Sequence, residues 1–371
     1  MTPPSPETQL LVGHLGRWGT NPLRLLEDGA ALGPVFSLRL WRPAMVGYSP
    51  DWNRFVLGDL SLFRSRGSLS GMSPHLGAGI VHTDVPNHRT RRRELNPPFA
   101  RPAISPWAQP ITDAVRARLP VGAFDAVQWS ATLVRELLNL VFFGGLFSTA
   151  LLDRFLRPLD APLPIPFLRR PWLFAKVNRA LDQAIKHGSD TNLSTAFRGL
   201  HDARDEARVA LSAGYDTTAH TLAWLLHHVA GNPQWLHASM RGPVIDEALR
   251  LYPAGWVGTR RCAEDTEFEG ITIRRGTLVM YSPYLTHRDP VLWPDPLTFA
   301  PERFARAIPA WGFIPFSAGE RTCLGKPLAR LILDCVLAAL QDSHLQNLSG
   351  DPRPRAGITL APSEPLWLVR G

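Results

Sequence analysis

One cysteine in the C-terminal part of the chain lies in the stretch FSAGERTCLG, which runs from Phe316 to Gly325. Its two glycines permit tight backbone turns and the close approach of a flat ligand. A helix that is expected to begin near Leu324 would point its positive N-terminal end at the sulfur of Cys323. Because this helix end and the nearby Arg321 both favour thiolate over thiol, the sequence predicts a nucleophile or a metal ligand here.

The other cysteines help to decide between these two roles. The three cysteines, at 262, 323 and 335, match neither the spacing of a paired-thiol zinc site nor a disulfide framework, which favours a reducing, cytoplasmic location. No cysteine-protease signature surrounds Cys323. Ligation of haem iron therefore fits better, because a thiolate donor pushes electron density towards O–O cleavage. Cys335 lies on an apolar stripe of a predicted helix and is expected in the core. Cys262 is expected in a strand.

The stretch resembles the haem-ligand loop of the cytochrome P450 family, whose pattern is Phe-x-x-Gly-x-Arg-x-Cys-x-Gly. The five fixed positions are matched by Phe316, Gly319, Arg321, Cys323 and Gly325. The resemblance implies haem b (iron protoporphyrin IX) with Cys323 as the iron ligand. It also implies a mainly α fold with small β-sheets (α+β), in which the haem lies between a long central helix and the helix that follows the cysteine loop.

Further upstream, EALR places Glu247 and Arg250 three residues apart on one helical face, and PERF supplies Arg303. Two guanidiniums around one carboxylate form a planar hydrogen-bonded network that lysine could not reproduce. An ordinary surface ion pair is the alternative for such a spacing alone. The order of these residues resembles the Glu-x-x-Arg motif and the arginine that completes it in the same family.

The two propionates of haem need cations or strong hydrogen-bond donors, since burying carboxylates without partners is costly. The resemblance assigns this role to His88 and Arg92 in DVPNHRTRRREL, to Arg260 in TRRCAED, and to Arg321. Arg261 is an alternative to Arg260. A solvated basic helix face is the alternative for residues 88–93.

The segment AGYDTT, from Ala213 to Thr218, resembles the oxygen-activating segment of the family. There Ala213 and Gly214 would let the helix pass close over the haem. An acid and alcohol pair, Asp216 and Thr217, would open or kink the hydrogen-bond ladder of the helix. The alcohol would hold the distal oxygen of bound O2, and the carboxylate would relay protons. A mid-helix threonine that bonds back to a carbonyl is the alternative.

The acid and alcohol pair favours a monooxygenase that inserts one oxygen atom of O2 into a C–H bond. Because the chain has no flavin or nicotinamide fingerprint, its electrons are expected from a separate ferredoxin-type donor with its reductase, docked by charge on the cysteine side of the haem. Candidates for that patch, for which general solubility is the other explanation, are Arg89, Arg91, Arg93, Lys326 and Arg330. A haem-binding protein or sensor without oxygenase activity is the alternative class.

The rest of the chain must position these residues. At 371 residues and 45% hydrophobic, the chain can bury a large core, and we expect a single domain over 1–371. Helices are expected at 129–143, 151–157, 172–185, 203–229, 244–251 and 327–340. Strands are expected within 33–49, and within 267–283 around a turn at Arg275-Gly276. The short stretch between 231 and 241 predicts missing or shortened peripheral helices.

The composition excludes some other classes. The formal charge is +8 and the sequence pI is about 10.0, but the basic residues are scattered, so nucleic-acid binding is not expected. The N-terminal residues lack the pattern of a signal peptide. Residues 209–230 are long enough to cross a bilayer, yet they contain Asp216 and three histidines. They therefore predict a buried helix and no transmembrane segment.

The substrate pocket is expected to be built from residues 67–80, 163–174, 254–259 and 358–362 together with the helix near Ala213. These segments are mostly apolar or small, which suits a bulky hydrophobic substrate. The run EALRLYPAGWVGTRR looks like bacterial family members that hydroxylate carotenoid or terpenoid rings, and a carotenoid is favoured over fatty acids, steroids or secondary metabolites. The stretch LPIPFLRRPWLF is a candidate for peripheral membrane contact.

Overall fold

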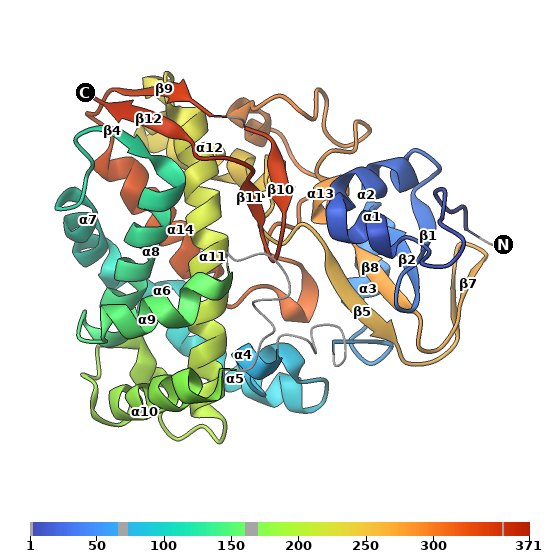
Figure 1. The fold of residues 1–371 in the computed structure, drawn as a ribbon, viewed down its shortest axis with the longest axis horizontal. Helices are drawn as coiled ribbons and strands as arrows, with labels where there is room; N and C mark the ends of the chain where they lie inside the picture. Colours follow the sequence, from blue (N-terminus) through green and yellow to red (C-terminus); the bar gives the residue numbers. More distant parts are fainter. Residues whose placement is uncertain (1–2, 66–72, 160–169, 351) are drawn as a thin grey trace.

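The computed structural model describes residues 3–65, 73–159, 170–350 and 352–371. It is rich in helices and has small sheets, which confirms the expected fold class. Figure 1 shows a helical part built around the long helix α11 (Ala203–Val229). Beside it lies a smaller part, in which the N-terminal helices and strands gather around a sheet.

The other helices of the described chain follow in sequence order. They are α1 (Leu15–Thr20), α2 (Pro22–Ala30), α3 (Pro50–Gly58), α4 (Ser73–Leu76), α5 (Asn87–Phe99), α6 (Arg101–Ile104), α7 (Ala108–Arg116), α8 (Ala126–Phe143), α9 (Thr149–Leu156), α10 (Pro171–His187), α12 (Ala238–Leu251), α13 (Pro283–Thr286) and α14 (Lys326–Ala339). All six helices expected from the sequence are present, with ends shifted by a few residues.

The strands in the described residues form four small sheets. They are β1 (Val35–Arg39), β2 (Pro43–Gly47), β3 (Phe63–Arg64), β4 (Gly122–Asp125), β5 (Gly258–Cys262), β6 (Thr266–Phe268), β7 (Ile271–Ile273), β8 (Leu278–Tyr281), β9 (Leu345–Ser349), β10 (Pro354–Ala356), β11 (Leu360–Pro362) and β12 (Trp367–Arg370). The largest sheet has the order β1-β2-β8-β5-β3. Strands β2 and β8 are parallel, and the other neighbours in this sheet are antiparallel.

The expected turn at Arg275-Gly276 is present, but the strands on its two sides, β7 and β8, belong to different sheets. The tight hairpin is instead β6–β7, joined by Glu269 and Gly270, which both have positive φ angles (48° and 79°). A two-residue turn of this kind needs positive φ at both positions, which glycine supplies at one of them. After the turn at 275–276 the chain enters β8, which pairs with β2 and β5 and is buried at all four positions.

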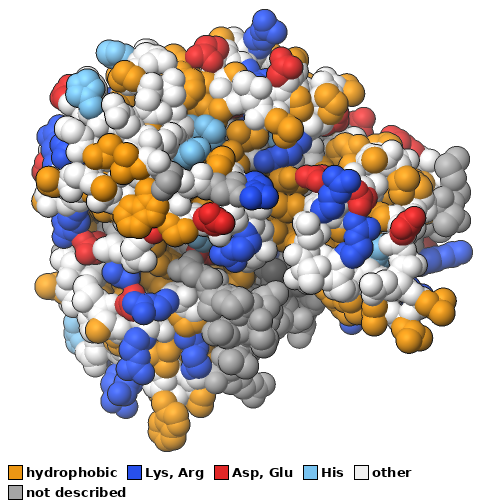
Figure 2. All heavy atoms as spheres, turned by 45° about the horizontal axis from the view of Figure 1, so that its top comes forward, with side chains coloured by type: hydrophobic (Ala, Val, Ile, Leu, Met, Phe, Trp, Pro, Cys, Tyr) orange, Lys and Arg blue, Asp and Glu red, His pale blue; other side chains and the backbone are white. Residues whose placement is uncertain are grey.

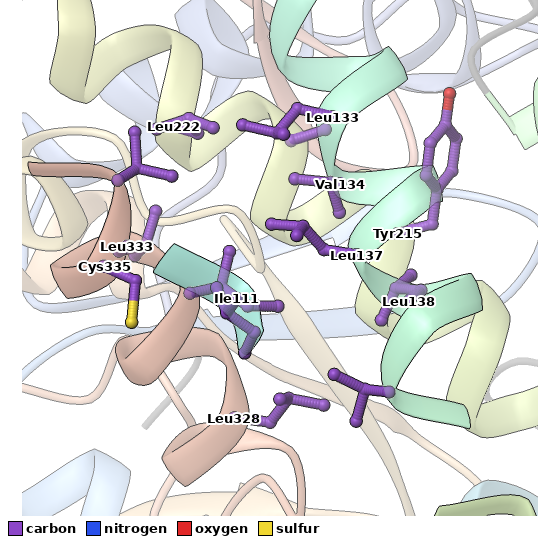
Figure 3. Packing of buried hydrophobic residues seen from close by; sticks show 14 of the residues in the cluster. Ile111, Leu133, Val134, Leu137, Leu138, Tyr215, Leu222, Leu328, Leu333 and Cys335 are labelled. Carbon is purple, nitrogen blue, oxygen red and sulfur yellow. The ribbon is translucent and has the colours of Figure 1, made fainter. Parts of the chain in front are cut away.

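The main hydrophobic core lies where α7, α8, α11 and α14 meet (Figure 3). Leu133, Val134 and Leu137 of α8 point into it together with Leu222 of α11 and Leu333 of α14. Helix α8 can start where it does because the Asp125 side chain accepts a hydrogen bond from the Val127 N–H. The helix ends at Gly144, which adopts the left-handed conformation typical of helix C-termini. Cys335 of α14 belongs to this core, as expected.

Helix α11 has the bounds that the sequence predicts, and most of its residues are buried. Helix α11 is contacted by α8, α9, α10, α12 and α14, so buried residues occur around its circumference. An amphipathic surface helix would bury only one side. Within the part of the chain that the structure describes, no helix has the length and apolar character needed to cross a membrane.

The stretch between α11 and α12 is short, as expected. A single 3₁₀ turn at Pro233–Leu236 is followed almost at once by α12, which begins at Ala238. The sequence placed the start of this helix near Val244, because Pro243 normally interrupts a helix. In the structure Pro243 lies inside α12.

Candidate active site

A cavity of about 660 Å³ lies where the middle of α11, the cysteine loop, α5 and β5 meet. This volume is typical of sites for cofactors and small ligands. Its walls are largely apolar. They include Leu138 and Phe142 of α8, Val209 and Ala210 of α11, Leu328 and Ile332 of α14, and Ala254, Trp256 and Ile358 from loops on the other side.

The cysteine loop, residues 316–325, folds back on itself and places Cys323 at the cavity. The Cys323 N–H donates to the carbonyl of Phe316 (2.8 Å). Gly319 has a φ of +68°, and a Cβ atom there would lie 2.7 Å from the carbonyl oxygen of Leu57, at the end of α3. Both the backbone conformation and this close approach therefore require glycine at 319.

The sulfur of Cys323 lies beside the N-terminus of α14, where the N–H groups of Gly325 and Lys326 point towards it. The residue is exposed, but its exposed surface borders the cavity. Burial raises the pKa of the Cys323 thiol, and these N–H groups and the charges of Arg92 and Lys326 offset only part of that effect. The helix end thus acts in the expected direction, towards the thiolate. A metal cation bound to the sulfur would favour the thiolate further.

The four residues expected to hold the propionates all border this cavity: His88 and Arg92 from α5, Arg260 from β5, and Arg321 from the cysteine loop. Arg260 is buried, whereas its neighbour Arg261 is exposed. Burial, followed by the charges of Arg321 and Arg92, lowers the pKa of His88 to about 4. Burial, followed by the charge of Arg260, lowers the pKa of Arg321 to about 10. Basic groups that lower one another's pKa in this way form a site that favours the binding of negatively charged groups.

Several donors of this basic set are left for a ligand. Among the described residues, His88 Nδ1 and the Nε atoms of Arg260 and Arg321 are buried without a hydrogen-bond partner. One protein carboxylate does approach, because Asp84 Oδ1 lies 3.2 Å from an Arg321 nitrogen. Two further carboxylates would satisfy the remaining donors. The residues present therefore fit haem: donors for two propionates, apolar walls for the macrocycle and a sulfur for the iron.

Glu247 forms the predicted network with two arginines. The Nε and Nη2 atoms of Arg250 donate to its two oxygens (2.7 and 2.8 Å), and Arg303 Nε donates to Oε1 (3.0 Å). The side chains of Glu247 and Arg250 are 0% exposed. Arg250 also donates to backbone carbonyls at 287, 296 and 298. The network thus joins α12 to the segment that leads to the cysteine loop, so its role is structural.

Helix α11 passes along the cavity without interruption. Ala213, Gly214 and Thr217 border the cavity, and Ala213 is exposed although most of the helix is buried. A Cβ atom at Gly214 would lie 3.4 Å from Leu138, an ordinary contact distance, so packing against α8 does not by itself require glycine here. The Thr217 hydroxyl donates to the Ala213 carbonyl (2.5 Å). This is the back-bond to a carbonyl that the sequence offered as the alternative, and it forms within a helix that is continuous from Ala203 to Val229.

Asp216 lies on a different side of α11. Its side chain is not part of the cavity wall, and the residue is 3% exposed. It accepts a hydrogen bond from the Thr359 hydroxyl (2.8 Å), and its other oxygen lies 3.5 Å from Nδ1 of His220. The structure therefore separates the acid and the alcohol: Thr217 reaches the cavity, and Asp216 is held behind it.

The pocket walls agree in part with those expected. Ile80, Ala213, residues 254–259 and Ile358 border the cavity. The expected walls at 67–72 and 163–169 lie outside the described residues, as does most of the stretch proposed for membrane contact. The described residues 170–174 at its end are not part of the cavity wall.

Sequence analysis missed two tryptophans of the wall, Trp18 of α1 and Trp41 of the β1–β2 turn. Trp41 is 58% exposed, so it marks a place where the cavity meets the surface. No local pattern connects these N-terminal residues to a site near the C-terminus. Only the tertiary contact between the N-terminal sheet and the helical part brings them there.

The basic residues do not gather as the docking prediction requires. Arg91 pairs with Asp202 and Glu206 of the α11 region, Arg89 pairs with Glu320 (2.7 Å), and Arg330 pairs with Asp246. On the face shown in Figure 2, basic side chains are mixed with acidic and hydrophobic ones. Three of the five candidate docking residues are thus already paired with acidic side chains, which weakens the five-residue patch as a docking site.

The fold and the cavity together are those of a helical haem enzyme, and known proteins share them. Residues 242–360 match the family model of cytochrome P450. The chain is 28% identical to cyclooctat-9-en-7-ol 5-monooxygenase of Streptomyces melanosporofaciens, over 88% of this chain and 85% of that protein. It is 27% identical to cyclooctatin synthase of the same organism, over 95% of this chain and 92% of that protein.

Two solved structures are similar along nearly the whole chain. The retinoic acid-bound cyanobacterial CYP120A1 has a TM-score of 0.87 at 20% identity and covers 100% of this chain and 99% of its own. A six-coordinated cytochrome P450 from Thermus thermophilus has a TM-score of 0.80 at 25% identity, with 94% and 98% covered. The chain belongs to the cytochrome P450 family. It is a monooxygenase that uses haem, O2 and electrons from a redox partner on hydrophobic substrates.

Proposed function

We propose that Cys323 is the axial ligand of the haem iron and that the four basic residues of the cavity hold the propionates. The observation that carries this proposal is the convergence of a sulfur at a helix N-terminus, the middle of α11 and four basic side chains, three of them with an unsatisfied nitrogen, on one cavity. Haem, when bound, supplies the redox chemistry that activates O2. Phe316, Gly319 and Gly325 shape the loop that presents the sulfur.

Thr217 and Asp216 then divide the handling of oxygen and protons. The Thr217 hydroxyl donates a hydrogen bond to the Ala213 carbonyl, so its oxygen remains free to accept a hydrogen bond from the cavity. A protonated group in the cavity that donates to this oxygen would be held in one orientation beside α11. Asp216, which lies next in the helix and is buried, supplies protons from the side of α11 that faces away from the cavity.

We expect Thr217→Ala to uncouple O2 consumption from product formation. The alanine cannot orient a proton at the cavity, so product formed per NADPH consumed should fall by about 10-fold or more, with peroxide released instead. Haem binding and the ferrous–CO spectrum should not change, since the hydroxyl only bonds back to its own helix. Product, NADPH and peroxide would be measured in one reaction. Thr217→Ser is the matched control, and full coupling in Thr217→Ala would exclude this role.

We infer that the substrate is a terpenoid with a hydrocarbon ring, such as the ring end of a carotenoid. The support is the apolar cavity wall and its surface opening beside Trp41, which allows a long molecule to enter by one end. A relative of the chain is named as a 5-monooxygenase of cyclooctat-9-en-7-ol.

The substrate proposal predicts which compounds shift the Soret band of the haem-loaded protein. Cyclic terpenoids and carotenoid end groups should shift it at micromolar concentration. Trp41→Ala should weaken the binding of long compounds more than that of short ones, because Trp41 lies at the opening. Fatty acids of similar length are the comparison set. A panel in which fatty acids or steroids bind and terpenoids do not would refute the proposed substrate class.

The electron donor is proposed to be a ferredoxin with its reductase. It would approach the surface on the cysteine side, where Lys326 is exposed at the start of α14 and Arg89 is exposed beside Glu320. We further propose that residues 1–371 work as one domain in the cytoplasm, in keeping with three free cysteines.

A further inference from the structure

Asp216 belongs to a buried polar group of three residues that the proposed function does not yet explain. His220 lies one helical turn further along α11, and Thr359 lies in the turn between β10 and β11. All three residues are buried, and Thr359 Oγ1 is within hydrogen-bond distance of both partners, at 2.8 Å from Asp216 Oδ2 and 2.7 Å from His220 Nδ1. The hydroxyl therefore stands between an acid and an imidazole.

The donor and acceptor roles in this group follow from counting protons. Thr359 has one hydroxyl proton, and it is donated to Oδ2 of Asp216. The same hydroxyl oxygen can then only accept from the imidazole, so Nδ1 of His220 must carry a proton. This arrangement occupies Oδ2. Oδ1 of Asp216 is a buried oxygen that makes no hydrogen bond with the described residues, and Nδ1 of His220 lies 3.5 Å from it.

The turn that carries Thr359 is anchored independently of Asp216. The Trp224 indole N–H donates to the Leu360 carbonyl (3.0 Å), and the Trp256 indole N–H donates to the Gly357 carbonyl (3.0 Å). The Leu360 N–H donates to the Ala254 carbonyl (3.2 Å). Removing the Thr359 hydroxyl should therefore free the carboxylate of Asp216 without displacing the turn.

Resting on the proposed role of Asp216, we propose that Thr359 and His220 are positioning residues that hold this carboxylate in one orientation, with Oδ1 available to take and pass a proton. The two neighbours of Thr359 in the turn, Gly357 and Ile358, border the cavity. The wall that contacts the substrate and the group that orients the acid thus belong to the same short turn.

The proton transfer balances without any further reactant. A proton that reaches Oδ1 of Asp216 neutralises the carboxylate, and its departure towards the cavity restores the charge. Thr359 keeps its own proton, directed at Oδ2, throughout, and His220 keeps the proton on Nδ1. Their function is to prevent the carboxylate from rotating, because rotation would exchange the free and the bonded oxygen.

The test compares Thr359→Val, which keeps the shape but removes the hydroxyl, with Thr359→Ser, which restores it. Thr359→Val should lower product per NADPH by about tenfold, less than the loss of an acid–base group itself would, and Thr359→Ser should recover most of it. The substrate-induced shift of the Soret band should be unchanged in both, so the loss appears in turnover and not in binding. Ser363→Ala, an exposed hydroxyl just beyond β11, is the matched control.

A second readout does not depend on activity. In the diamagnetic ferrous–CO form of the haem-loaded protein, ¹⁵N NMR of labelled histidine should show His220 protonated at Nδ1, assigned by the signal lost in His220→Gln. Thr359→Val should shift that signal and leave the others in place. A His220 signal protonated at Nε2 alone, or full coupling in Thr359→Val, would overturn the proposal.

Asp216→Asn separates this inference from the function on which it rests. If Asp216→Asn uncouples the reaction and Thr359→Val does not, the positioning role fails while the proton role of the acid stands. If Asp216→Asn is fully coupled, the proposed role of the acid fails, and the inference fails with it. If both variants uncouple, the double variant should lose no more than Asp216→Asn alone, because both act through one carboxylate.

Discussion

Replacing Cys323 with serine should abolish the thiolate-specific Soret band of the ferrous–CO form and reduce monooxygenase activity to background. The serine hydroxyl is nearly isosteric, but it does not supply the soft, electron-donating sulfur that iron ligation of this type requires. Haem should still enter the cavity, because the basic side chains and the apolar walls are unchanged. The measurements are the absorption spectrum of the reduced protein under carbon monoxide and product formation with a ferredoxin system.

The matched control for this variant is Cys262→Ser. Cys262 is buried at the end of β5, and its S–H donates to the Glu264 carbonyl (3.0 Å), a bond that a serine hydroxyl can replace. This variant should keep both the spectrum and the activity. Retention of the thiolate band in Cys323→Ser, or its loss in Cys262→Ser, would show that the sulfur ligand has been assigned to the wrong residue.

Glu247→Ala is expected to have the largest effect on stability. It would leave Arg250, which is 0% exposed, and Arg303 without their shared carboxylate. Breaking a buried ion pair by removing one partner costs about 3–5 kcal/mol, because the remaining charge stays buried and unpaired. The free energy of unfolding should fall by that amount. The segment that leads to the cysteine loop should loosen with it, so that less haem is retained after purification.

Asp246 provides a control from the neighbouring position on α12. It pairs with Arg330, whose side chain is 31% exposed, so Asp246→Asn should change the free energy of unfolding by less than about 1 kcal/mol. Denaturant unfolding of both variants, followed by circular dichroism and by haem absorbance, measures the difference. Equal effects at the two positions would mean that the Glu247 network is no more important than a surface ion pair.

The central parts of the fold and the site could be predicted because their signals are local. The cysteine loop needs a glycine at 319 for its backbone angle, and α11 is a long segment without proline that ends just before Gly231. The Glu247 pair follows from a three-residue spacing on one helix. In each case a short pattern determines the geometry.

The features that were missed depend on tertiary contacts or on a balance of opposing effects. Trp18 and Trp41 join the cavity only through the packing of the N-terminal sheet against the helical part. Burial raises the pKa of the Cys323 thiol and opposes the helix end, and this burial follows from tertiary packing that the loop sequence does not reveal. Thr359 lies far from Asp216 in the sequence, so no pattern on α11 could reveal their hydrogen bond.

The position of the two tryptophans has a practical consequence for protein engineering. Trp18 and Trp41 of the cavity wall lie in the N-terminal part of the chain, whereas the sulfur, the basic side chains and the oxygen-handling residues lie between residues 88 and 325. Trp41 at the opening and the residues assigned to haem and oxygen are thus encoded in different parts of the gene. A library confined to residues 15–42 can vary the molecules admitted and leave the catalytic apparatus untouched, provided that the pairing of β2 with β8 is kept.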